Sequence, residues 1–240
     1  MTSMRPWNPI PIADNGEPLL ALPPFLLRIE PHPYRRLGAP YGAAGCPFRL
    51  RQGVIARLGE AHRQLVSEAP GWRLAIFDAW RPVAVQRFMV AYAIRQECLS
   101  RGVDPDREGP ERRAVEEAVG RFWAPPSDDP AMPPPHSTGA AVDLTLTDAS
   151  GGLLDLGGDI DAIGPVSEPD HHAAAALADP IGPEARWHGR RQLLQRVMLA
   201  AGFVQHPNEW WHFSHGDQLW AWSLGEPRAC YGGWAAAERP

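Results

Sequence analysis

The chain has 240 residues, of which 44% are hydrophobic and 21% charged, so it has enough apolar material for a compact folded domain. All 23 basic residues are arginine, which excludes enzymes that need a Schiff-base lysine or a phosphate-loop lysine. The net charge of -5 and the scattered arginines argue against nucleic acid as a partner.

The first part of the chain is irregular and the next part is strongly patterned. Residues 1–50 are rich in Pro and Gly without sustained periodicity, which predicts an extended N-terminal arm with short strands. Apolar residues at spacings of four, three and four predict a helix over residues 53–68. The apolar stretch 72–78 predicts a buried strand, so Arg81 is expected at a strand end. Pro82 then suits the first turn of another helix.

The middle of the chain predicts a helix, a loop and a strand. Mixed charges over residues 111–122 predict a helix, and the Pro-rich stretch 124–135 predicts a loop. Residues 140–146 alternate between apolar and polar, which is typical of a half-buried strand. Asp143 should therefore face away from the apolar row of this strand.

The last third predicts two helices followed by short strands. A short helix is expected over 171–176, and Pro183 should open a longer one that Gly202 stops after Ala201. Arg190 and Arg191 are expected on its solvated face. Three strands are predicted after it, over 203–206, 210–214 and 218–222.

Two short runs carry residues suited to metal chemistry. His136 precedes Asp143 by seven residues, with Gly139 able to provide the turn that an odd offset requires. Glu209 precedes His212 by three residues. Two imidazoles and one carboxylate, namely His136, His212 and Asp143, form the three-ligand set that leaves the fourth position of zinc open for water.

Two further residues fit the hydrolysis of an amide at such a centre. Glu209 is the candidate general base, because a water activated by zinc still needs a group to carry its proton to the leaving amine. Arg81 is the candidate for stabilising the negative charge that develops on the scissile carbonyl oxygen.

These runs resemble the metallo D-alanyl-D-alanine dipeptidases, the VanX-type zinc DD-peptidases, over residues 74–222. The D-x-x-R-P motif of that family is matched by residues 78–82, and H-x-x-G-x-A-x-D by residues 136–143. The E-x-W-H motif is matched by residues 209–212, and a G-x-x-[FI]-D segment by residues 157–161.

The resemblance implies a function and a fold. It implies cleavage of the dipeptide D-alanyl-D-alanine with one zinc ion per chain, and it gives the ligand, base and arginine roles to the residues named above. It also implies that Asp161 binds the free amine of the substrate. The expected fold is α+β, one domain over residues 1–240, with a small mostly antiparallel sheet, flanking helices and the DD-peptidase/Hedgehog-like fold.

Details of substrate recognition depart from the family or stay open. The family commonly has Ser two residues before the first zinc histidine, whereas Pro134 stands there and can offer only its carbonyl. One of Trp210 and Trp211 should wall the site, and we assign substrate binding to Trp210. A D,D-carboxypeptidase or an L,D-type peptidase acting on larger cell-wall peptides is the alternative function. A binding module without turnover is a third, although the four metal-site residues are all present.

Location and partners are predicted from what the sequence contains. The three cysteines, Cys46, Cys98 and Cys230, form no C-x-x-C pair, which favours a reducing compartment. Two prolines interrupt the apolar stretch 19–27, so neither a signal peptide nor a membrane span is predicted. We therefore expect a cytoplasmic enzyme with a small-molecule substrate and no membrane partner. The oligomeric state is left open.

Overall fold

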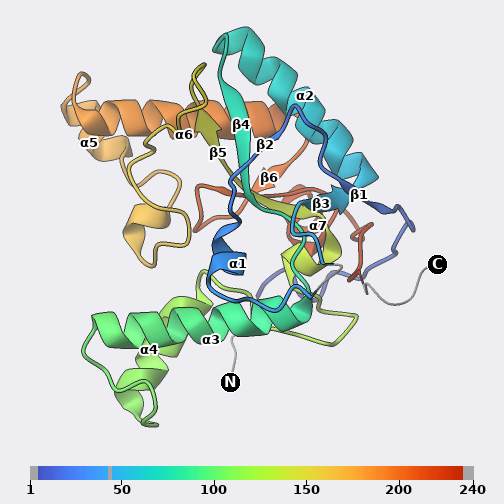
Figure 1. Cartoon of the computed structure of the whole chain (residues 1–240), viewed down its shortest axis with the longest axis vertical. Coiled ribbons are helices and arrows are strands. Elements are labelled where there is room, and N and C mark those ends of the chain that lie inside the picture. The colour runs from blue at the N-terminus through green and yellow to red at the C-terminus, as the bar shows by residue number, and fades with distance from the viewer. Residues whose placement is uncertain (1–4, 43–44, 235–240) are drawn as a thin grey trace.

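The computed structural model describes residues 5–42 and 45–234, and within them a five-stranded sheet forms the centre of the molecule (Figure 1). Its strands are β2 (Leu27–Arg28), β4 (Arg73–Asp78), β5 (Ala141–Thr147), β6 (Val204–Gln205) and β7 (His212–Ser214). The strand order is β2-β4-β5-β7-β6, with β2 parallel to β4 and the other neighbours antiparallel. A separate antiparallel pair consists of β1 (Leu19–Ala21) and β3 (Arg49–Arg51).

Helices lie on both sides of this sheet. They are α1 (Pro33–Arg36), α2 (Gln52–Glu68), α3 (Val83–Ser100), α4 (Pro110–Gly120), α5 (Ala173–Ala178), α6 (Pro183–Ala200) and α7 (Gln218–Leu224). Figure 1 shows α2 and α6 together at one end of the view and α3 and α4 packed on each other at the opposite end. The α+β class and the mostly antiparallel sheet are confirmed. None of the helices in the described ranges is both long and apolar enough to cross a bilayer.

The two sides of the sheet have different cores. Apolar side chains of α2 and α6 pack against β4, β5 and β7 in the main core. A second cluster joins α1, α3 and α4. The polar residues described below lie on the face of β5 that is turned away from the main core.

The burial of strand β5 agrees with the sequence prediction on one face and differs from it on the other. Val142, Leu144 and Leu146 belong to the main core, so the predicted apolar row is confirmed. The prediction of a half-buried strand is wrong, because all seven residues of β5 are buried. β5 lies between two other strands, and the side chains around Asp143 cover its polar face where water was expected.

The last predicted strand is also wrong, because residues 218–224 form helix α7. Asp217 caps this helix, since its Oδ1 accepts a hydrogen bond of 2.9 Å from the main-chain N–H of Trp220. Gly225 ends the helix in the left-handed conformation with φ of 69°. The N-cap and the C-terminal glycine are the sequence signals that mark this segment as a helix.

The predicted arm contributes to the fold as well as wrapping it. β2 is an edge strand of the main sheet, and β1 and β3 pair beside α2. Residues 1–4 and 43–44 of the predicted arm lie outside the described residues.

Candidate metal centre and active site

The turn that carries His136 is built by a glycine. Residues 135–138 form a short 3-10 helix, and Gly139 then adopts φ of 72°. A Cβ at Gly139 would lie 2.2 Å from Cδ2 of Leu19, so the position has neither the conformation nor the space for a side chain. The turn allows the chain to enter β5 with His136 on the same side of the sheet as Asp143, as the odd offset requires.

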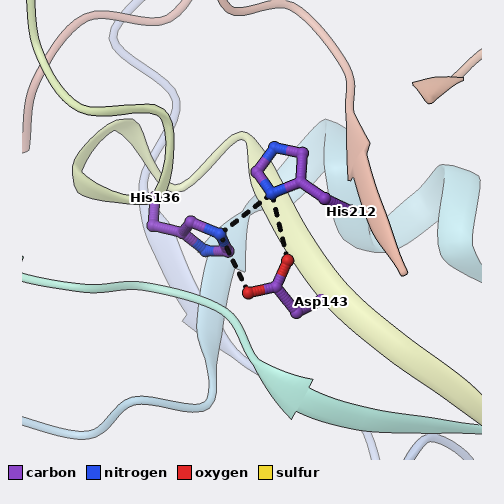
Figure 2. A group of neighbouring side chains, drawn as sticks. All are labelled: His136, Asp143 and His212. Carbon is purple, nitrogen blue, oxygen red and sulfur yellow. Dashed lines mark hydrogen bonds and ion pairs between the residues drawn. The ribbon is translucent and has the colours of Figure 1, made fainter. Parts of the chain in front are cut away.

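Strand register brings the other two candidate ligands together. Asp143 on β5 lies directly opposite His212 on β7, and such cross-strand neighbours hold their side chains side by side. His212 Nδ1 lies 3.0 Å from Asp143 Oδ1, and His136 Nε2 lies 3.2 Å from both Asp143 Oδ2 and His212 Nδ1 (Figure 2). All three residues are buried.

Hydrogen bonds on the far sides of the two rings fix which nitrogens face inward as acceptors. His136 Nδ1 lies 2.7 Å from the carbonyl oxygen of Ala79, so this nitrogen carries the proton and Nε2 has the free lone pair. The Ser214 hydroxyl donates to Asp217 Oδ2 at 2.8 Å, so its oxygen can accept from His212 Nε2 at 3.3 Å. His212 Nδ1 therefore also has a free lone pair.

This donor set fits a divalent cation such as zinc. Two imidazole nitrogens and a carboxylate face one another at short range, and both are donor types that zinc binds. Zinc bonds of about 2.0–2.1 Å place tetrahedral ligands about 3.3 Å apart, close to the observed separations of 3.0–3.2 Å. Burial alone would raise the pKa of Asp143, but His136 and His212 hold it well below its usual range.

Glu209 lies beside this centre in the turn between β6 and β7. Its Oε2 is 3.6 Å from His212 Nδ1, and its Oε1 is 3.8 Å from His206 Nδ1. Burial, followed by the nearby negative charge of Asp143, raises the pKa of Glu209 to about 8. The carboxyl group can therefore change its protonation state near neutral pH.

Arg81 reaches the centre from the end of β4, as predicted from its position after a strand. Its main-chain N–H donates to the carbonyl of His136 at 3.2 Å. Its guanidinium pairs with Asp78 at 2.7 Å and with Asp143 at 3.3 Å, and it donates to Gln86 Oε1 at 2.8 Å. The group is thus a fixed, buried positive charge next to the candidate ligands.

Asp161 lies in the long loop that follows β5, in a conformation that few residues adopt. Its φ is 69°, in the left-handed region that Asp tolerates better than most side chains. The Tyr34 hydroxyl donates to Asp161 Oδ2 at 2.8 Å. Burial, followed by the negative charge of Asp143, raises the pKa of Asp161 to about 7. A cationic ligand would relieve this cost.

The structure exchanges the expected positions of the two neighbouring tryptophans. Trp211 is among the residues that line the cavity over the metal site, whereas Trp210 is not among the described residues there. Trp210 packs on the guanidinium of Arg191, with 5.0 Å between the guanidinium carbon and the ring centre. The substrate-binding role of Trp210 stays a prediction, and Trp211 is the tryptophan of the pair that lines the cavity. Arg191 is buried in this contact and is not on a solvated helix face.

Pro134, the departure from the family motif, lies beside the site and not in it. It lines a neighbouring cavity, and its carbonyl accepts a hydrogen bond of 2.9 Å from the main-chain N–H of Ser137. Pro135 lines the cavity over the metal site.

The candidate residues line one small cavity. Besides the three candidate ligands and Glu209, its lining comes from the N-terminal segment, α3, the end of α4 and the loops: Arg5, Arg81, Gln86, Phe122, Trp123, Ala124, Pro135, Asp161, His206 and Trp211.

Several of the site residues were not predicted. Arg5, Tyr34 and Gln86 come from segments without a metal-type motif, so no local signal marked them. Asp78 could have been found, since it stands three residues before Arg81 in the matched D-x-x-R-P run. It pairs with that arginine and accepts from His32 Nε2 at 3.1 Å, so it is part of the same buried network.

Comparison with known proteins gives consistent matches. The family model described as D-ala-D-ala dipeptidase, Peptidase_M15, matches residues 28–229. A D-alanyl-D-alanine dipeptidase of Synechocystis sp. is 40% identical over 232 residues, covering 94% of this chain and 92% of the relative. One of Escherichia coli is 30% identical over 148 residues, covering 62% and 58%. A solved vancomycin-resistance D,D-pentapeptidase, VanY, in complex with Zn(II) is 13% identical with a TM-score of 0.46, covering 90% of this chain and 89% of that chain.

Proposed function

Because this chain belongs to the Peptidase_M15 family of D-Ala-D-Ala dipeptidases, which makes it a metallopeptidase, we propose that it hydrolyses D-alanyl-D-alanine to two D-alanines with one zinc ion per chain. The names of the relatives at 40% and 30% identity support this substrate. The small cavity supports a small peptide as the ligand. Action in the cytoplasm stays a prediction from the sequence.

One observation carries the proposal: His136, Asp143 and His212 direct three acceptor groups at one point, beside a buried carboxyl group that can exchange a proton. Zinc held by these three residues would act as a Lewis acid and lower the pKa of a water molecule to about 7. The rest of the chemistry falls to the side chains of the chain itself.

Glu209 is proposed as the general base and acid. Its carboxylate takes the proton of the attacking water and returns it to the nitrogen of the leaving D-alanine. The raised pKa of about 8 suits a group that must both accept and release a proton. Burial of Glu209 keeps competing bulk water away from this transfer.

Arg81 and Asp161 are proposed to act on the substrate itself. The Arg81 guanidinium is held in place by two carboxylates and Gln86, so it can stabilise developing negative charge on the scissile oxygen without reorganising. Asp161 is proposed to bind the free ammonium of the substrate, with Tyr34 orienting the carboxylate.

The test is metal analysis of the purified protein together with a substrate panel. We expect about one zinc per chain and hydrolysis of D-Ala-D-Ala. We also expect no measurable hydrolysis of L-Ala-L-Ala or of N-acetyl-D-Ala-D-Ala, because the acetyl group removes the ammonium that pairs with Asp161.

Two results would contradict this function. If the purified protein neither contains nor takes up a divalent metal, the assignment of a metal centre is contradicted. Efficient cleavage of the acetylated peptide would instead favour the alternative, a D,D-carboxypeptidase or an L,D-type peptidase acting on longer cell-wall peptides.

A further inference from the structure

The first described residues of the chain form part of the wall of the cavity. Trp7 packs into a small apolar cluster with residues of β6 and α7. The side chain of Gln218, at the start of α7, donates to the main-chain carbonyls of Asn8 at 3.0 Å and Ile10 at 2.7 Å. The segment from Arg5 to Ile10 is therefore fixed to the folded domain.

This anchoring directs Arg5 toward the metal site. Arg5 is half-buried and lines the same cavity as Glu209 and His136. Its Nη2 donates to the carbonyl of Gly120 at 3.4 Å, at the end of α4, and to that of Phe122 at 3.3 Å, just beyond it.

Arg5 differs from Arg81 in having no acidic partner. Within residues 5–42 and 45–234, no carboxylate oxygen lies within 4.0 Å of a nitrogen of Arg5. Its neighbours are main-chain carbonyls and, at 3.3 Å, Nε2 of His206. The charge of Glu209 acts on Arg5 from a greater distance. A positive charge that is largely removed from water and has no paired carboxylate is suited to an anionic group of a ligand.

The substrate of the proposed reaction has such a group. A free dipeptide carries an ammonium at one end and a carboxylate at the other. Asp161 is held by the Tyr34 hydroxyl, and Arg5 is held by main-chain carbonyls at the end of α4 and by His206. Both side chains line the cavity over the metal site. The cavity thus offers a negative charge for one end of the substrate and a positive charge for the other.

We propose that Arg5 binds the free carboxylate of the substrate and makes the enzyme selective for peptides that end at the second residue. This inference rests on the proposed dipeptidase function. Arg81 is less suited to the task, because Asp78 and Asp143 already pair with its guanidinium. A C-terminal extension would remove the free carboxylate that pairs with Arg5, so longer peptides should bind less well.

The test compares D-Ala-D-Ala with its C-terminal amide, which lacks the negative charge. Binding is measured by calorimetry in zinc-loaded Glu209→Gln, with and without Arg5→Gln, and turnover is measured in the enzyme with Glu209 intact. Arg5→Gln should weaken dipeptide binding by about 10- to 100-fold, the loss expected for one charge-assisted interaction. Binding of the amide should change less than about threefold. Arg5→Lys should recover part of the preference for the free carboxylate.

Arg63→Gln is the matched control, because it removes one positive charge from an exposed position on α2. This control substitution should leave the binding affinity for both the dipeptide and its amide unchanged. Equal losses for dipeptide and amide in Arg5→Gln would show a purely structural role and overturn the proposal, as would failure of the zinc-loaded protein to bind the dipeptide. Binding that depends on Arg5, in an enzyme that does not cleave the dipeptide, would instead count against the proposed function alone.

Discussion

The metal ligands and the residues proposed to recognise the substrate lie in one cavity, but different parts of the fold hold them. Asp143 and His212 are neighbours on paired strands, and the residues next to them in sequence belong to the main core. Asp161 and Arg5 lie on segments without regular structure. The metal centre is therefore positioned by the register of the sheet. The residues proposed to recognise the substrate are positioned by a few side chains that hydrogen-bond to the main chain of loops.

One such side chain holds the loop of Asp161. Arg191 on α6 donates hydrogen bonds to three main-chain carbonyls of this loop, those of Leu156 at 2.7 Å, Glu168 at 2.9 Å and Val166 at 3.0 Å. One buried guanidinium thus replaces the hydrogen bonds that a strand or helix would have supplied. Substitutions in the two regions should have separable effects.

The largest effect is expected from breaking the strand-held centre with His212→Ala. Removing an outer hydrogen-bond partner of a metal ligand already lowers metal affinity by about 10- to 100-fold. Loss of the ligand itself should therefore lower the affinity for zinc by more than about 100-fold and abolish activity. Equilibrium dialysis followed by metal analysis measures this loss. His188→Ala, a half-buried histidine of α6, should keep full zinc content. Stoichiometric zinc in the His212 variant would contradict the ligand assignment.

Glu209→Gln separates the metal from the chemistry within the same region. The amide keeps the shape of the side chain but cannot carry a proton, so kcat should fall by about 10²- to 10⁴-fold while zinc content stays at one per chain. Steady-state kinetics on samples of known metal content measure the difference. Turnover at the normal rate would remove Glu209 from the role of base.

The pH dependence of substrate capture tests the recognition region. The pKa of Asp161 is raised to about 7, so its anionic form is lost as the pH falls through neutrality. A neutral carboxyl group cannot pair with the substrate ammonium, so below pH 7 kcat/KM should fall by about a further tenfold for each pH unit, in addition to the fall caused by protonation of Glu209. Asp161→Asn should have a lower kcat/KM and keep only the part of the fall that Glu209 causes. An unchanged fall in the variant would assign it to another group.

The smallest effect on activity is expected from loosening the loop with Arg191→Met. Three buried carbonyls lose their donor, so the free energy of unfolding should fall by about 2–4 kcal/mol. KM should rise more than kcat falls, and zinc content should not change. Denaturant unfolding and kinetics measure these effects, with Arg190→Met as the neighbouring control, since Arg190 makes one such bond. Loss of zinc in the Arg191 variant would show that the two regions are not separable.

The same division explains what the sequence could predict. His136, Gly139 and Asp143 lie within eight residues, so a turn residue and the alternation of one strand determine how they meet. The bounds of α2, β4 and α6 follow from periodicity and from proline and glycine at their ends. Segments of this kind encode their geometry locally.

The remaining features depend on contacts between distant parts of the chain. The choice between Trp210 and Trp211 was not predictable, because Trp210 packs on Arg191, which lies nineteen positions earlier on a different element. Asp161 takes its conformation from a clamped loop, and Arg5 reaches the cavity only because α7 holds its segment. Periodicity within one segment cannot predict such contacts between segments that are far apart in the sequence.

The carboxylate of Asp217 belongs to two structures at once. One oxygen caps α7, and the other accepts from Ser214, whose hydroxyl oxygen faces the outer nitrogen of His212. The next residue, Gln218, holds the N-terminal segment at Asn8 and Ile10. Two adjacent residues at the start of α7 thus connect this segment with the outer hydrogen bond of a candidate metal ligand.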